Sequence, residues 1–163
     1  MRLAGTMVSG MDEHHHALKD LGEKLFGEKY INDIPPAYMR ELKRYLDTAD
    51  ASVGLVKNHK ERAAYWLNGR SLGVLGCTGT NDGDIERIDG KIHQLDHIAA
   101  VDLTVNVHYD AGAQRASTGR RLTIGDAESP EIVLDASPGH FLLDKRAEVE
   151  QFIDQLLAAL AGH

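Results

Sequence analysis

The sequence is poor in cysteine and in long apolar runs. Its 163 residues contain one cysteine, Cys77. A single cysteine cannot form an internal disulfide, which excludes a disulfide-built domain and favours a reducing compartment. No stretch of about 18 apolar residues occurs, so the sequence predicts no membrane-spanning helix.

Basic residues are also few relative to acidic ones. The chain has 18 Lys and Arg against 25 Asp and Glu, a formal net charge of −7. Because an acidic chain repels nucleic acid at long range, we expect no nucleic-acid partner. Residues 1–11 lack the charged start and apolar run of a signal peptide. These features predict a soluble, cytoplasmic protein.

Two helices are predicted before residue 50. The first spans residues 12–26, after a flexible start, because apolar residues recur there at three- and four-residue spacing: Leu18, Leu21, Leu25 and Phe26. The second begins at Pro36, since proline suits the first turn of a helix, and runs to Asp47. We therefore expect residues 1–49 to form an N-terminal helical arm.

After Asp50 the pattern changes to short strands. Asn68-Gly69 predicts a two-residue hairpin turn between strands at 63–67 and 70–77. A second turn is predicted at Asp89-Gly90. The clearest strand spans residues 99–109, where apolar and polar residues alternate, which predicts one buried face. The residues of that face are Val101, Leu103, Val105 and Val107.

Residues 50–163 are predicted to form one domain that ends in a helix. After a polar loop at 110–119, short strands are expected at 121–125 and 131–134. The closing helix, over residues 144–160, carries a wide apolar stripe: Val149, Phe152, Ile153, Leu156, Leu157 and Leu160. Short connections between strands require antiparallel pairing, so the predicted fold class is α+β.

Four segments resemble the bacterial pleckstrin-homology-like (PH-like) family. They are Leu42–Leu46, Ile92–Val101 with its hydrophobic-Asp-hydrophobic turn, the Leu-Thr-Ile strand at 122–124, and the closing helix. The resemblance covers residues 41–161. The sequence departs from the family at two places. An acidic, glycine-containing loop follows Cys77, and the strand before that loop lacks a Thr-x-x-Arg lead-in.

The resemblance implies a curved antiparallel barrel of about seven strands, capped by the C-terminal helix. Such barrels are usually binding modules with no common reaction. We therefore expect a non-catalytic binding or protein-interaction module with no cofactor, whose partner is an unknown protein or a second copy of the chain. Fold alone does not establish function.

The second helix offers one candidate interface. Its apolar face is made by Tyr38, Met39, Leu42 and Leu46. In one version this face packs on the chain's own barrel. In another it forms a homodimer interface across a two-fold axis. The sequence leaves both versions open.

Basic residues near the first hairpin offer a candidate ligand site. They are Lys57, Lys60, Arg62 and Arg70. In a PH-like barrel such residues can hold a phosphorylated headgroup at a membrane surface, provided that several cations converge on one phosphate. Glu61 interrupts the set, and a solvated hairpin is the competing interpretation.

An enzyme is the rival class of function. Gly69–Gly73 matches the G-x-S-x-G nucleophile elbow of hydrolases, with Ser71 as the nucleophile. That mechanism needs a helix directly after the serine, whereas Val74 and Leu75 indicate a strand. No P-loop, dinucleotide fingerprint or H-E-x-x-H motif occurs.

Metal binding is a further alternative. His14–His16 form a cluster, and on a helix His16 shares a face with Asp20, so these two side chains could bind one metal ion. Histidines near a terminus are, however, more often solvated. Thr78–Asp89 has a faint calcium-loop outline around Asp82, but threonines stand at its first and third ligand positions. Cys77 has no activating partner in sequence and is expected to be a small buried apolar residue.

Overall fold

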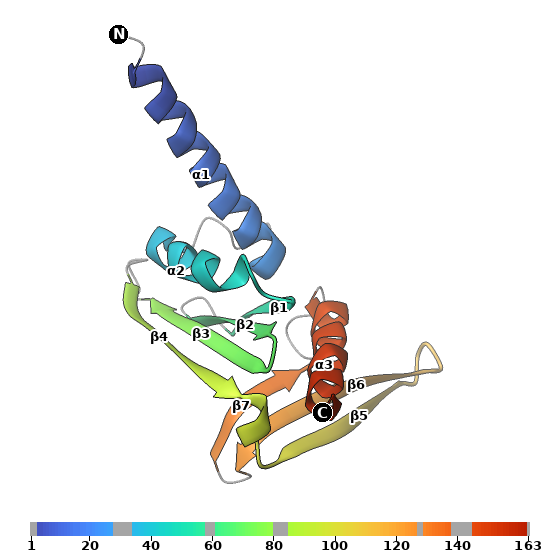
Figure 1. The fold of residues 1–163 in the computed structure, drawn as a ribbon. Helices are drawn as coiled ribbons and strands as arrows, with labels where there is room; N and C mark the ends of the chain where they lie inside the picture. The colour runs from blue at the N-terminus through green and yellow to red at the C-terminus, as the bar shows by residue number, and fades with distance from the viewer. Residues whose placement is uncertain are drawn as a thin grey trace. The chain divides into compact units, whose positions relative to one another are not determined.

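The computed structural model describes residues 3–27, 34–57, 61–79, 85–126, 129–137 and 145–162. Three α-helices, seven strands and one short 3-10 helix follow one another in these ranges (Figure 1). They are α1 (Leu3–Phe26), α2 (Pro36–Leu46), β1 (Ala51–Val56), β2 (Glu61–Asn68), β3 (Ser71–Gly79), β4 (Ile85–Gln94), η2 (Leu95–His97), β5 (Val101–Asp110), β6 (Arg115–Asp126), β7 (Ser129–Asp135) and α3 (Arg146–Ala161). None of the helices in these ranges is both long and apolar enough to cross a membrane.

The strands form two antiparallel sheets, ordered β1-β2-β3-β4 and β5-β6-β7. The predicted α+β class, the two N-terminal helices and the C-terminal helix are confirmed. The predicted barrel is not closed within the described residues. The two sheets separate between β4 and β5. The 3-10 turn Leu95–His97 and residues 98–100 lie there, so the first sheet ends before β5 begins the second.

The chain divides into two compact units, each built from two segments of the sequence. The first unit comprises residues 1–65 and 74–90, and the second comprises residues 66–73 and 91–163. Strands β2, β3 and β4 therefore each supply residues to both units.

In the first unit, α2 packs through the apolar face that the sequence predicted. Tyr38, Met39 and Leu42 are buried, and Leu46 is half-buried. The Tyr38 hydroxyl donates a hydrogen bond to the carbonyl oxygen of Leu75 in β3, at 2.7 Å. The Tyr38 ring also lies 6.1 Å from the ring of Phe26, at the end of α1. The structure therefore places this face in the interior of the chain's own first unit.

Helix α1 is longer than the sequence predicted. It begins at Leu3 rather than near Asp12, so the expectation of a flexible start was wrong for residues 3–11. No proline precedes Pro35, and residues such as Ala4, Met7 and Met11 have good helix propensity. Helix propensity therefore outweighs the two glycines of this segment.

The predicted β2–β3 hairpin is confirmed. Strand β2 ends at Asn68 and β3 begins at Ser71, with Gly69 at φ 56° in the turn. The predicted turn at Asp89-Gly90 is wrong, because β4 runs through both residues as one strand. A side chain at Gly90 would come within 2.2 Å of the Val74 carbonyl oxygen. Glycine is therefore required there for close approach of two strands, not for a turn.

In the second unit, α3 covers part of the β5-β6-β7 sheet. The helix contacts β6 and β7. The buried residues of the strands and of the helix form one core: Leu122, Ile124, Ile132, Leu134, Val149, Phe152, Ile153 and Leu156. The predicted apolar stripe of the closing helix is thus confirmed. Strand β5 runs to Asp110 and β6 begins at Arg115, so six of the ten residues of the predicted polar loop at 110–119 are strand.

An ion cluster fixes α3 to β6. The Arg120 guanidinium lies 2.5 Å from a Glu150 carboxylate oxygen and 2.7 Å from one of Asp154. The backbone N–H of Arg120 also donates to Glu150, at 2.9 Å. The hydrogen bonds that Arg120 donates to Asp154 and Glu150 raise the pKa of Arg120 above its ordinary value. The guanidinium is therefore a fixed cation that orients the helix.

Candidate functional site

The four basic residues proposed for a headgroup site have different surroundings. Lys57 is exposed just after β1, whereas Arg62 in β2 is only 5% exposed. Lys60 lies outside the described residues. Arg70, in the β2–β3 turn, is bound by protein acceptors. A phosphate cradle needs several cations that face solvent together. Arg62 is buried, and the partly exposed Arg70 guanidinium already donates to protein oxygens.

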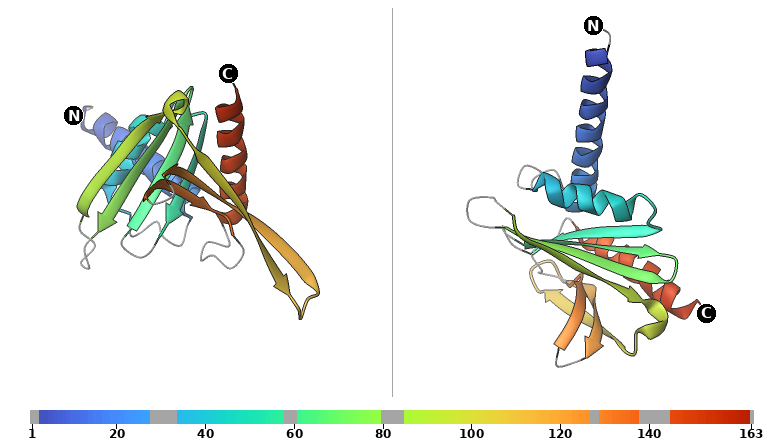
Figure 2. Two further views of the ribbon diagram at one scale, coloured as in Figure 1. Left: turned by 90° about the horizontal axis from the view of Figure 1, so that it is seen from below. Right: turned by 60° about the vertical axis from the view of Figure 1, so that its left-hand side comes forward.

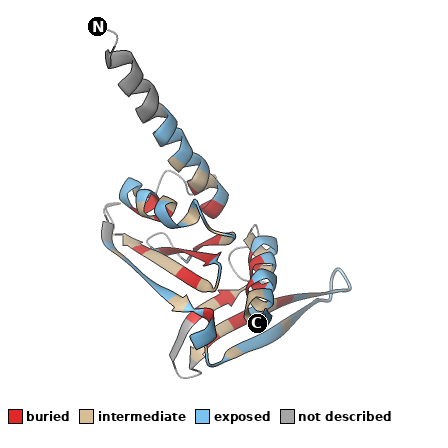
Figure 3. Cartoon of the chain, in the orientation of Figure 1, coloured by how far each residue is buried: buried red, intermediate tan, exposed pale blue. Residues whose placement is uncertain are grey.

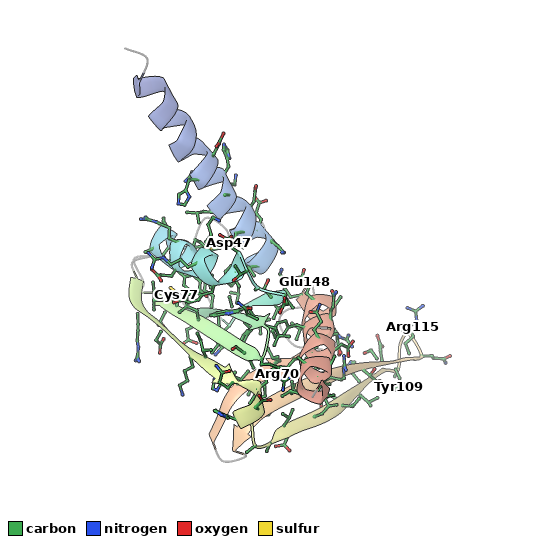
Figure 4. All side chains as sticks on the ribbon, in the orientation of Figure 1. Asp47, Arg70, Cys77, Tyr109, Arg115 and Glu148 are labelled. Atoms are coloured by element: carbon green, nitrogen blue, oxygen red, sulfur yellow. The ribbon has the colours of Figure 1, made fainter. Side chains whose placement is uncertain are left out.

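Arg70 binds the C-terminal end of α3 instead. Its Nη1 donates to the carbonyl oxygens of Ala159 and Gly162, the latter at 2.9 Å, and its Nη2 lies 2.6 Å from Asp96 (Figure 4). The last carbonyls of a helix have no partner within the helix, and a cation is favoured at that end. Arg70 therefore has a structural contact that the sequence could not reveal.

The serine motif lacks the local structure that its mechanism needs, and the calcium-loop outline lies partly outside the described residues. Ser71 is the first residue of β3, and strand rather than helix follows it. The strand–turn–helix geometry of a nucleophile elbow is therefore absent at this motif. The calcium-loop outline runs from β3 into β4, and residues 80–84, including Asp82, lie outside the described residues.

The histidine cluster lies on an open face of α1. His14, His15 and His16 are exposed. Among the residues that the structure describes, no group of three or more His, Cys, Asp or Glu side chains could hold a metal ion. His15 also borders a groove of about 300 Å³ between α1 and α2, whose floor includes Leu18 and Met39. That volume is at the lower limit for small-molecule pockets.

A buried polar cluster lies inside the first unit. Tyr38, Arg62 and Cys77 are each buried, so Cys77 has the environment that the sequence predicted. Burial raises the pKa of the Cys77 thiol, and the charge of Arg62 offsets this only in part. Burial likewise raises the pKa of Tyr38 far above its ordinary value. These groups stay protonated near neutral pH, which does not suit a nucleophilic cysteine.

The largest departure from expectation is the apolar face of β5. The sequence predicted a buried face at Val101, Leu103, Val105 and Val107, but only Val101 is half-buried, and Leu103 is 46%, Val105 55% and Val107 67% exposed. Tyr109, the next residue on that face, is 64% exposed. Figure 3 shows β5 as exposed along most of its length. We call these four exposed residues the β5 apolar strip. Large apolar side chains grouped on a surface indicate an interaction site more strongly than scattered ones.

The pairing register and the contacts of α3 together show why this strip is open. Leu103 pairs with Leu122, and Val105 pairs with Arg120, so the strip shares a sheet face with the core that α3 covers. The helix contacts β6 and β7, and the β5–β6 ribbon extends beyond it (Figures 1 and 2). Tyr109 lies toward the far end of that ribbon (Figure 4). The strip is thus an uncovered continuation of the core face.

Strand β5 is also an edge strand. It stands at one end of the order β5-β6-β7, and no described strand pairs with its outer side. An edge strand presents backbone N–H and C=O groups that can pair with another chain. The edge strand β7 contains Pro130, and the edge strand β4 contains four charged residues, both of which discourage such pairing. The ten residues of β5 contain no proline, lysine or arginine, and its two charged residues, Asp102 and Asp110, stand near its ends.

The chain has no match among known proteins in the three comparisons. No family model, no curated protein and no solved structure matches it. We therefore infer the function from the chain's own surface.

Proposed function

We propose that this protein is a non-catalytic protein-interaction module that binds its partner through β5. One observation carries the proposal: four large apolar side chains are about half to two-thirds exposed on one face of an unprotected edge strand. Together they expose on the order of 400 Å², the size at which an apolar patch on a monomer is often functional.

The free energy of burial favours a partner that covers the β5 apolar strip. If a partner covered all of this surface, its removal from water would contribute at most on the order of 10 kcal/mol before the costs of association are subtracted. Backbone groups along the outer edge of β5 add main-chain hydrogen bonds with an extended partner segment. Both contributions require a macromolecular partner, because an open strand face does not enclose a small molecule.

The PH-like resemblance remains part of this proposal. Its support is the order of elements, with helix α2 before the strands and helix α3 after the last one. In that family the architecture serves binding rather than one reaction, which agrees with a module that works through a surface. The proposal depends on the β5 apolar strip and not on the family.

Site-directed photo-crosslinking in intact cells tests this function. A photo-reactive phenylalanine analogue at Val107 would report what touches the strip, with the same analogue at the exposed α3 residue Gln155 as the control. We expect a discrete heavier product from position 107 and none from position 155. No product at 107, or the same products at both positions, would contradict an interaction surface on β5.

A further inference from the structure

We infer that the partner of the β5 apolar strip is a second copy of this chain, paired antiparallel through β5 about a two-fold axis at Val105. This inference rests on the proposed function and specifies its partner. The pairing would join the two β5-β6-β7 sheets, one from each copy, into one continuous sheet.

The register follows from the sequence of β5. With the axis at Val105, every residue from Val101 to Tyr109 finds a partner, and the apolar strip meets itself. Leu103 lies opposite Val107 of the second copy, and Val101 opposite Tyr109. Residues directly opposite in an antiparallel pair point to the same face, so apolar side chains contact apolar ones along the whole strip.

The polar face of the strand supports the same register. With the axis at Val105, Asp102 lies opposite His108 of the second copy, and Thr104 lies opposite Asn106. The Asp102 carboxylate of each copy then faces a side chain that can donate a hydrogen bond to it. The alternative axis at Asn106 pairs as many residues, but it places Asp102 opposite Asp110. Like charges directly opposite are destabilising, which favours the axis at Val105.

The area available indicates a reversible dimer. The two strips together expose about 800 Å², roughly half of what a standard interface buries. Edge pairing covers the flanks of these side chains and the backbone edge, while part of their outer face stays open. We therefore expect self-association at micromolar concentration rather than a permanent dimer.

A cysteine at the axis tests the register directly. In Val105→Cys the two introduced residues would lie opposite each other, about 4.5–5.5 Å apart between Cα atoms, which a disulfide can bridge. The matched control is Val107→Cys, on the same face and also exposed. Its two copies would lie about 14 Å apart along the strands, which is too far for a disulfide. The native Cys77 is buried and present in both variants.

We expect mild oxidation of the purified protein at micromolar concentration to link Val105→Cys into a dimer at least tenfold faster than Val107→Cys. Equal rates for the two variants would overturn the register. Equal urea midpoints for both variants and the unaltered protein would show that neither substitution unfolds the chain.

A charge swap gives an independent test. His108→Asp places carboxylates opposite one another, so sedimentation velocity should show dimerisation weakened about tenfold or more. The double variant D102H/H108D restores an Asp–His pair in the antiparallel register and should recover most of the affinity. Failure of the double variant to recover it would overturn the pairing.

The two levels of the proposal fail in different ways. If Val105→Cys does not crosslink and the photo-crosslinker at Val107 captures a different protein, the second-copy inference is overturned and the interaction surface stands. If position 107 captures nothing in cells, the proposed function itself fails.

Discussion

Gly73 stands where β3 passes directly over the Trp66 ring, so adding one methyl group there should be costly. A Cβ atom at Gly73 would lie 2.1 Å from Cε2 and 2.2 Å from Cζ2 of that ring. A carbon–carbon contact needs about 3.5 Å, so the strand and the ring would have to separate by roughly 1.5 Å. The ring is 4% exposed and rigid, so it has no flexible end that could yield.

We expect Gly73→Ala to lower the free energy of unfolding by about 2–4 kcal/mol, since overpacking and loss of aromatic packing act together. Gly76→Ala, in the same strand, is the matched control. A Cβ atom there would meet its nearest neighbours at 3.6 and 3.7 Å, which is ordinary contact. That variant should stay within about 1 kcal/mol of the unaltered protein, because alanine also restricts the unfolded chain.

Urea unfolding followed by far-ultraviolet circular dichroism measures both variants, provided that their m-values agree. Trp66 is the only tryptophan, so its fluorescence separately reports whether the ring has moved. Trp66→Leu should reduce the cost of Gly73→Ala, giving a coupling of about 1 kcal/mol or more in a double-mutant cycle. Equal urea midpoints for Gly73→Ala and Gly76→Ala would refute the reasoning.

Three further predictions follow from buried or bridging polar groups. Burial holds the pKa of Tyr38 above its ordinary 10.0, so the free energy of unfolding should fall as the pH rises above about 10. Urea titrations at about pH 8 and 11 measure this fall, and Tyr38→Phe should make it smaller. An equal fall in the variant and the unaltered protein would contradict this. Arg120→Met should lower the free energy of unfolding by about 1–3 kcal/mol in urea, and by more than Asp154→Asn, because the Asp154 side chain is 67% exposed. Equal costs would contradict the view that Arg120 fixes α3 to β6. Arg70→Met should speed amide exchange in the last turn of α3 severalfold, and unchanged exchange would show that Arg70 does not hold the helix end.

The sequence predicted the elements whose signals are local. Pro36 marks the start of α2, Asn68-Gly69 marks the hairpin, and the helical spacing of Val149, Phe152 and Leu156 marks the buried face of α3. Each signal depends on neighbours a few residues away in the chain. Elements of this kind could therefore be placed without knowledge of the fold.

The candidate site could not be predicted, because exposure is set by distant parts of the chain. The alternation in β5 correctly identified Leu103, Val105 and Val107 as one face, but it carries no information about which layer covers that face. The interpretation of a buried face was wrong because α3 lies over β6 and β7. Arg62 shows the converse: it looked like a solvated cation, yet β2 is buried from Arg62 to Leu67.

Carbene footprinting across a dilution series tests the central claim most directly. It measures how strongly Leu103–Tyr109 is labelled as the purified protein is taken from nanomolar to high micromolar concentration. Our account predicts strong labelling at high dilution and protection at high concentration, with the exposed residue Gln155 labelled equally throughout. Weak labelling at every concentration would contradict it, since the β5 apolar strip would then be covered within its own chain. Strong labelling at every concentration would contradict the second copy as the partner.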